Sequence, residues 1–260
     1  MKIIVLVKQV PDTSEERTLD TESGFLERDP QGNVLDEISE RALEVALRHK
    51  DSHKGTEVVA LTMGPSDALK ALRKALSMGA DSGVHVADDA LAGADAMWTS
   101  RVLAAAASAE GFDLVITGNE STDGKCGVVP AMVAEHLRLP LVGSLDSPGI
   151  SAESVSGRRE CGTGTMTVRA GLPAVMSVTE RSAEARFPTF KGILTAKKKS
   201  VKNVALAELG LSGATVSTAG RSVILSVARV EGRSGGRKIV DHNGSAATEL
   251  MEFLADRQLL

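Results

Sequence analysis

Short apolar runs rich in β-branched residues alternate with helical segments over the first two-thirds of the chain. These runs occupy residues 3–7, 57–61, 83–87 and 113–117. Continuous apolar runs of this length are typical of parallel strands that are buried on both faces. The alternation therefore predicts an α/β fold: one parallel sheet with helices on both faces and right-handed crossovers.

The segments between the runs have helical patterns. Residues 41–50 place small and apolar side chains on one stripe, as an amphipathic helix does. Ser66 is a candidate cap for a second helix, which Gly79 would end. The alanine-rich segment 94–110 predicts a third helix, and residues 131–137 lie in a fourth. Ligands of such sheets bind beyond the carboxyl ends of the strands, which directs attention to the loops 8–12, 62–66 and 118–130.

Two regions depart from this alternation. Turn-forming residues in the segment 18–35 predict a short β-hairpin excursion. After Pro140 the pattern changes to short β-like pieces, at 150–156, 165–170 and 174–179, with a turn over 157–164.

The chain ends in a candidate arm. Residues 232–236 read Gly-Arg-Ser-Gly-Gly, which is typical of a linker. The helix expected after it carries Leu250, Phe253 and Leu254 on one stripe, and that stripe could pack on the chain's own core or on a partner. We therefore predict an α/β nucleotide-binding domain over 1–222 and a C-terminal arm over 223–260.

Composition excludes several classes of protein. The formal net charge of −4 argues against nucleic acid as the main partner. With five Phe, one Trp and no Tyr, a base-stacking platform is not expected. The two cysteines, Cys126 and Cys161, have no metal-ligand spacing and favour free thiols in a reducing compartment. Neither a signal peptide nor an apolar run of membrane-spanning length is evident, so we expect a soluble, cytoplasmic protein.

A glycine-flanked loop follows the run 113–117. Residues 118–126 read Gly-Asn-Glu-Ser-Thr-Asp-Gly-Lys-Cys. A Walker A motif has four residues between its glycines and Ser or Thr after the lysine, whereas this loop has five and Cys. An NTPase is therefore not predicted. Backbone N–H groups and the start of the next helix still favour a bound phosphate, and a purely structural loop is the alternative.

Recognisable catalytic motifs are absent. No G-x-G-x-x-G follows the run 3–7, and no G-x-S-x-G occurs. The five histidines do not form a metal-ligand pattern, and we predict no metal site. The glycines near Cys161 and Thr165 lie between β-like pieces and predict a hairpin turn. We therefore expect no catalytic residues and no reaction of the chain's own.

A basic run follows two of the scarce aromatic residues. Phe187 and Phe190 precede Lys197, Lys198 and Lys199. A solvated helix end explains the lysines alone. Aromatic residues beside a basic patch also suggest a docking site, with Phe190 exposed in a loop.

At these residues the sequence resembles the electron-transfer flavoprotein β-subunit family over nearly its whole length. The matching pieces are 5–12, 42–47, 62–65, 75–81, 118–130, 186–190 and 196–199. Each piece is short, but their order and spacing together are specific.

The resemblance implies a flavodoxin-type, Rossmann-like domain that binds AMP. It also implies a heterodimer with an α-subunit that holds most of an FAD. Such pairs carry electrons from acyl-CoA and related dehydrogenases, as in fatty acid oxidation, to a membrane quinone oxidoreductase. The AMP contacts would be Leu6, Asp36, Glu37, Ile38, Ser39, Met63, Gly118, Asn119, Glu120, Ser121, Thr122, Asp123, Gly124, Lys125, Cys126, Gly127, Val128 and Val129.

The family's partner-recognition loop maps to about 178–200, and its apolar anchor, usually Leu, falls on Phe190. Other positions depart from the family pattern. Asp36-Glu37 stands where Asn-Pro is frequent, and Lys125 replaces a second acid, which would aid an anionic nucleotide. Val128 replaces a Gln or Thr, which leaves the phosphate to N–H groups.

Three alternatives stay open at this point. In electron-bifurcating members of the family, a second FAD takes the place of AMP. An adenine-nucleotide-binding enzyme on a similar sheet would need a Ser-Gly-Gly-x-Asp-Ser type loop, which residues 8–12 lack. A stand-alone nucleotide sensor is the third.

Overall fold

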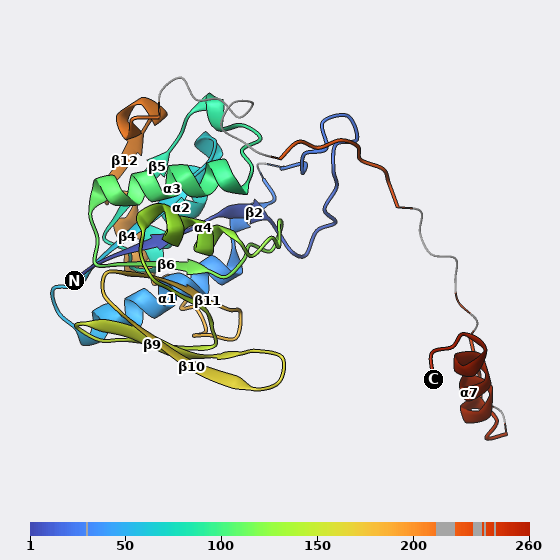
Figure 1. Cartoon of the computed structure of the whole chain (residues 1–260). Helices are drawn as coiled ribbons and strands as arrows, with labels where there is room; N and C mark the ends of the chain where they lie inside the picture. Colours follow the sequence, from blue (N-terminus) through green and yellow to red (C-terminus); the bar gives the residue numbers. More distant parts are fainter. Residues whose placement is uncertain (30, 212–221, 231–235, 237, 242) are drawn as a thin grey trace. The chain divides into compact units, whose positions relative to one another are not determined.

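The centre of the fold is a parallel sheet, seen in the computed structural model of residues 1–29, 31–211, 222–230, 236, 238–241 and 243–260 (Figure 1). Its strands are β1 (Lys2–Leu6), β4 (Glu57–Met63), β5 (Ser82–Val86), β6 (Leu114–Gly118), β7 (Leu141–Leu145), β11 (Ala174–Val178) and β12 (Val201–Val204). Their order is β12-β5-β4-β1-β6-β11-β7, and every neighbouring pair is parallel. The predicted α/β class is confirmed.

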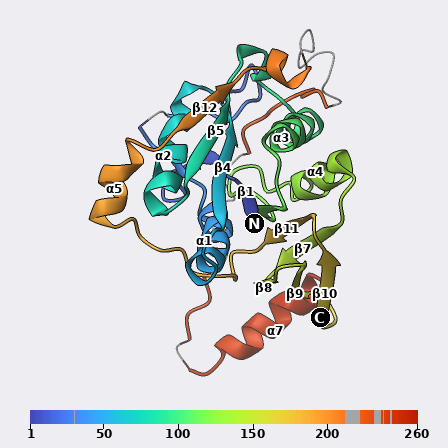
Figure 2. The same ribbon diagram turned by 90° about the vertical axis from the view of Figure 1, so that its left-hand side faces the viewer.

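Helices cover both faces of this sheet. They are α1 (Glu37–Ser52), α2 (Leu69–Met78), α3 (Ala96–Glu110), α4 (Val129–Leu137) and α5 (Phe190–Ala196), with 3-10 turns η1 (Ser66–Ala68), η2 (Asp89–Leu91) and η3 (Leu206–Leu209). In β1, Ile3 and Val5 pack with α1 and α2, whereas Ile4 and Leu6 pack with α3 and α4. Figure 2 shows these two helical layers on opposite sides of the sheet.

Local signals explain most helix boundaries. The carboxylate of Asp95 accepts a hydrogen bond from Trp98 N at the start of α3. Gly79 ends α2 with a positive φ of 146°, as predicted. Ser66 does not cap α2: it begins η1, and α2 starts at Leu69. The prediction failed because the chain makes a 3-10 turn before entering the α-helix.

The first β excursion differs from the predicted hairpin. β2 (Gln9–Pro11) pairs with β3 (Asn33–Leu35) in an antiparallel ribbon. Between them, the described residues hold one isolated antiparallel bridge, from Leu19 to Leu26. The described residues between β2 and β3 therefore form a long excursion, and β3 returns the chain to β2 beside the end of β1.

A second, three-stranded antiparallel sheet follows β7. Its strands are β8 (Ser147–Ile150), β9 (Ser154–Glu160) and β10 (Thr165–Gly171). The predicted turn over 157–164 was too long, because residues 157–160 pair in register with β10. The turn lies after them, where Cys161 N donates to Gly164 O over 2.9 Å, as the hairpin prediction at Cys161–Thr165 required.

The chain divides into two units, residues 1–225 and 226–260. The second contains α7 (Ala246–Asp256), on which Leu250 and Phe253 are 49% and 37% exposed. The predicted linker lies outside the described residues except for Gly236. In the part of the chain that the structure describes, no helix combines the length and apolar character that a bilayer crossing requires.

Candidate functional site

The topology places a crevice beside β1. From β1 the chain builds outward through β4 and β5 on one side, and it then returns to place β6 on the other. Helices that leave β1 and β6 therefore diverge to opposite faces of the sheet, and ligands of such folds bind at this switch point. A cavity of about 1180 Å³ lies there, at the carboxyl ends of these strands.

Many of the predicted nucleotide contacts line this cavity. They are Leu6, Ser39, Met63, Gly118, Asn119, Glu120, Ser121, Gly124, Cys126, Gly127 and Val129. The other predicted residues lie outside the lining: Asp36, Glu37, Ile38, Thr122, Asp123, Lys125 and Val128. Among these, Asp36, Thr122 and Asp123 are buried behind the cavity wall and shape the loop that forms it.

The loop 118–130 is folded tightly against the start of α1. A side chain at Gly118 would clash, since a Cβ there would lie 2.8 Å from Cγ2 of Ile38. Asn119 N donates to Val178 O over 2.8 Å, which ties the loop to β11. Lys125 N donates to Ser121 O over 2.9 Å and closes a turn. Glycine at 118 is thus a steric requirement of the close approach.

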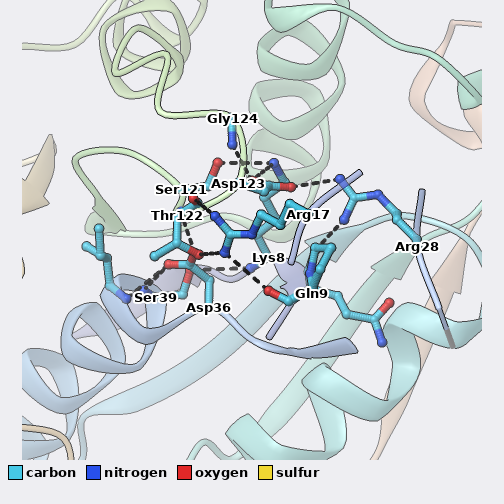
Figure 3. A network of polar contacts seen from close by, with 12 residues as sticks. Lys8, Gln9, Arg17, Arg28, Asp36, Ser39, Ser121, Thr122, Asp123 and Gly124 are labelled. Carbon is cyan, nitrogen blue, oxygen red and sulfur yellow. Dashed lines mark hydrogen bonds and ion pairs between the residues drawn. The ribbon is translucent and has the colours of Figure 1, made fainter. Parts of the chain in front are cut away.

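Asp36 joins this loop to α1. Its Oδ1 caps the helix by accepting from Ile38 N at 3.0 Å and Ser39 N at 3.2 Å. Its Oδ2 accepts from both N and Oγ1 of Thr122, each at 2.8 Å. Asp36 is completely buried, and Figure 3 shows it between the two elements. Both carboxylate oxygens therefore hold the loop to α1, and the nucleotide contact that the resemblance implies for Asp36 stays a prediction.

Asp123 lies between two cations at the cavity wall (Figure 3). Its carboxylate forms ion pairs of 2.7 Å with Nζ of Lys8 and with a guanidinium nitrogen of Arg28, and its side chain is only 2% exposed. Burial alone would raise the pKa of Asp123, but the charge of Lys8 and hydrogen bonds from Lys8, Ser121 and Arg28 lower it well below its usual range. Together, the cations Lys8 and Arg28 and the carboxylate of Asp123 carry a formal charge of +1.

The excursion loop contributes to the same wall. Arg17 donates to O and Oγ1 of Thr122, and Arg28 reaches Asp123. Phe25 packs over Gly93, where a Cβ would lie 2.7 Å from the ring. The excursion therefore spans the cavity mouth from the loop 118–130 to the segment before α3.

The cavity offers several groups to an anionic nucleotide. Helix α4 begins there without a side-chain hydrogen bond to its N-terminal cap in the described structure, and Val129 and Pro130 of its first turn line the cavity. Pro130 has no N–H, so the donors of this turn are the N–H groups of the other residues. Lys8 lines the cavity, and its ammonium group pairs with Asp123 and donates to Ser121 Oγ. The Oδ1 atom of Asn119 is buried and has no hydrogen-bond partner among the described residues, as an acceptor for a ligand hydroxyl or amine would be. No grouping of three or more metal-ligating residues occurs among the described residues.

The second candidate site is an apolar patch on segment 187–194. Phe187 is 91% exposed, Phe190 is 78% exposed, and Ile193 and Leu194 are each at least half exposed. The predicted exposure of Phe190 is confirmed, but Phe190 is the first residue of α5 and not part of a loop, because Thr189 caps the helix by accepting from Gly192 N.

The three lysines after α5 differ in their surroundings. Lys197 and Lys198 are exposed. Lys199 donates from Nζ to Leu76 O at 2.8 Å and Ala80 O at 2.6 Å, so it caps the end of α2. Desolvation lowers the pKa of Lys199 below its usual value. Two of the lysines are therefore available to a partner, and the third is mainly structural.

Sequence reasoning missed several cavity residues. Lys8 had a signal, because it directly follows a buried strand in a loop already marked as a ligand site. Arg28 and Phe25 had none, since nothing local shows where a long excursion returns. Other missed lining residues lie before and within α3 and after η3: Leu91, Gly93, Ala94, Asp95, Ala96, Thr99, Leu103, Ser222, Val223 and Ile224.

Comparison with known proteins gives one consistent result. Residues 24–209 match the family model described as "Electron transfer flavoprotein domain". The chain is 44% identical over 265 residues to the electron transfer flavoprotein subunit beta of Mycobacterium tuberculosis, covering 99% of each chain. It is 30% identical over 271 residues to the protein of the same name from Megasphaera elsdenii, covering 100% of each. It is also 33% identical over 213 residues to the Caffeyl-CoA reductase-Etf complex subunit CarD of Acetobacterium woodii, covering 82% of this chain and 81% of that one.

Proposed function

The chain belongs to the electron transfer flavoprotein family as a β-subunit with a role in electron transfer, and from this premise we propose that it binds AMP in the cavity beside β1 and β6. The AMP is structural and takes no part in redox chemistry. An α-subunit supplies the FAD that accepts and donates electrons. The chain itself carries out no catalytic step.

One observation carries this proposal. The uncapped start of α4, Lys8 and Asn119 all border one cavity at the switch point of the sheet. The N–H groups and Lys8 fit a phosphate. Asn119 fits a donor group on the ribose or base.

The electron path of the complex depends on docking. We propose that the patch around Phe190 receives acyl-CoA and related dehydrogenases, with Lys197 and Lys198 attracting acidic surfaces, and that a quinone oxidoreductase accepts the electrons. Heterodimer formation with the α-subunit would engage the arm over 223–260. We also propose a cytoplasmic location for this chain.

The cavity also supports a second candidate. Its volume of about 1180 Å³ exceeds what one mononucleotide fills. Its lining includes apolar residues such as Phe25, Leu103 and Ile224. A second FAD in place of AMP, as in electron-bifurcating members, is therefore the competing ligand.

Mass spectrometry of nucleotides released from the denatured protein distinguishes these candidates. We expect close to one AMP per chain and no hydrolysis of added ATP. Lys8→Gln should lower the AMP content, whereas Lys125→Gln should not, because Lys125 lies outside the cavity lining. FAD released from the isolated chain would contradict the AMP assignment and favour the second candidate.

A further inference from the structure

Polar side chains on one face of α1 form hydrogen bonds with residues 183–186, the segment that precedes the apolar patch. Arg41, Glu44, Arg48 and Asp51 are spaced by three, four and three residues, so they share one face of the helix. The guanidinium groups of Arg41 and Arg48 donate to the carbonyl oxygens of Ala183 at 3.4 Å and Glu184 at 3.3 Å. The carboxylates of Glu44 and Asp51 accept hydrogen bonds from Arg186.

Arg186 makes the strongest of these contacts. Its Nε donates to Glu44 Oε2 at 2.6 Å and a terminal nitrogen donates to Oε1 at 3.1 Å, in the bidentate geometry of strong arginine–carboxylate pairs. The same terminal nitrogen donates to Asp51 Oδ2 at 2.8 Å. The backbone N of Arg186 also donates to Glu44 at 3.3 Å, so both main chain and side chain are held.

The environment of Glu44 makes this pair more than a surface ion pair. The side chain of Glu44 is only 5% exposed, although it lies in the middle of α1. Burial alone would raise the pKa of Glu44, but hydrogen bonds from Arg186 and Arg48 outweigh it and lower the pKa below its usual value. The hydrogen bond to Glu44 likewise raises the pKa of Arg186. An ion pair between two exposed side chains is screened by solvent and would do little to fix the position of the segment. The Arg186–Glu44 pair is partly removed from water, so it can fix that position.

A second clamp holds the far end of the patch. From α2, Arg73 donates to the carbonyl oxygen of Ala196, the last residue of α5, at 2.8 Å and to that of Lys199, just after the helix, at 2.9 Å. In the middle, Gly192 lies so close to α2 that a Cβ there would overlap the carbonyl oxygen of Ser77. Helix α5 therefore lies directly on α2 and is fixed at its C-terminal end.

Between these clamps the chain turns its apolar side chains outward. Phe187, Phe190, Ile193 and Leu194 are the exposed members of the segment. None of them lies in the buried core clusters, so the core does not fix their direction. The backbone clamps do so instead, and a surface that is ordered before binding loses less conformational entropy when it binds.

We propose that Arg186 is a positioning residue for partner docking: by pairing with Glu44 and Asp51 it orients the Phe187–Phe190 turn, without touching the partner itself. This inference rests on the proposed function, which assigns the patch to dehydrogenase docking. It adds that affinity depends on a contact between α1 and the segment behind the patch.

The test measures binding of the purified heterodimer to an acyl-CoA dehydrogenase, for Arg186→Gln, Arg186→Lys, Phe190→Ala and the double variant with Arg186→Gln. Removing Arg186 leaves Glu44 paired with Arg48, so no buried carboxylate is orphaned. Arg181→Gln is the matched control, because Arg181 lies in the same segment but pairs with Asp146 and Glu160 instead of α1.

We expect Arg186→Gln to raise the Kd about fivefold, with partial recovery in Arg186→Lys and no change in Arg181→Gln. In turnover assays the KM for the heterodimer should rise while kcat and AMP content stay near the parent values. In the Phe190→Ala background, Arg186→Gln should have little further effect, since coupled residues are non-additive.

Two results overturn the inference in distinguishable ways. If Phe190→Ala weakens binding but neither Arg186 variant does, or if the Arg186 and Phe190 effects simply add, Arg186 does not position the patch and the docking assignment stands. If Phe190→Ala itself leaves the Kd unchanged, the patch is not the docking surface and the docking part of the proposed function fails with it.

Discussion

Replacing Phe190 with alanine is expected to weaken dehydrogenase binding about thirtyfold while leaving the fold intact. Loss of a central apolar anchor typically costs about 2 kcal/mol or more of binding free energy, which corresponds to that factor. Phe190 is 78% exposed in the isolated chain, so its removal leaves no cavity. A buried Phe would instead lower stability by about 3–5 kcal/mol on truncation.

The measurement is a titration of the heterodimer with an acyl-CoA dehydrogenase, alongside thermal unfolding. Met166→Ala is the control, since Met166 is an exposed apolar residue of the separate small sheet. Lys197→Gln with Lys198→Gln should mainly lower the association rate at low salt, because exposed charges steer encounter. A large fall in Tm for Phe190→Ala, with affinity unchanged, would assign Phe190 to the core and contradict the prediction.

Replacing Asp36 with alanine should have the largest effect on stability and on nucleotide retention together. The substitution leaves Ile38 N, Ser39 N and Thr122 N without their acceptor in a site that excludes water. Hydrogen bonds to a charged group contribute about 1.5–3 kcal/mol each, and unsatisfied buried donors add to the loss. We expect a destabilisation of about 3 kcal/mol or more, which lowers Tm by roughly 6–12 °C in a domain of this size.

The loop 118–130 should lose its fixed position at the same time, so AMP should be released during purification. Asp36→Asn should be intermediate, because one oxygen can still cap α1 while the amide meets Thr122. Asp20→Ala is the matched control, since Asp20 also accepts two backbone N–H groups but in an exposed turn. An Asp36→Ala variant with the parent's Tm and nucleotide content would show that Asp36 does not hold the loop.

The parallel sheet could be predicted because its strands are buried on both faces. Residues of β1 contact helices on each side, so the strand must be apolar throughout, and a continuous run such as 3–7 identifies it. The loop after β6 was also predictable, since glycine is needed where the backbone approaches Ile38. The burial of a strand and the need for glycine can both be predicted from residues that are close together in the sequence.

Long-range contacts could not be predicted in the same way. Residues 157–160 contain Gly and charged side chains that favour a turn locally, yet pairing with β10 makes them a strand. No local pattern predicted that the carboxylate of Asp36 accepts a hydrogen bond from Thr122, 86 residues away. Arg28 reaches Asp123 only because the excursion folds back over β1. Such partners depend on the tertiary path, which no local pattern encodes.

We propose that this chain transfers electrons only as part of a flavin-containing heterodimer. The most direct test is anaerobic mixing of the chain, co-purified with an α-subunit, with an acyl-CoA dehydrogenase and its substrate while flavin absorbance is followed. We expect bleaching of the heterodimer's FAD at catalytic amounts of dehydrogenase, and no turnover by the β chain alone. A chain that forms no complex with the α-subunit, or a heterodimer whose FAD stays oxidised under these conditions, would contradict it.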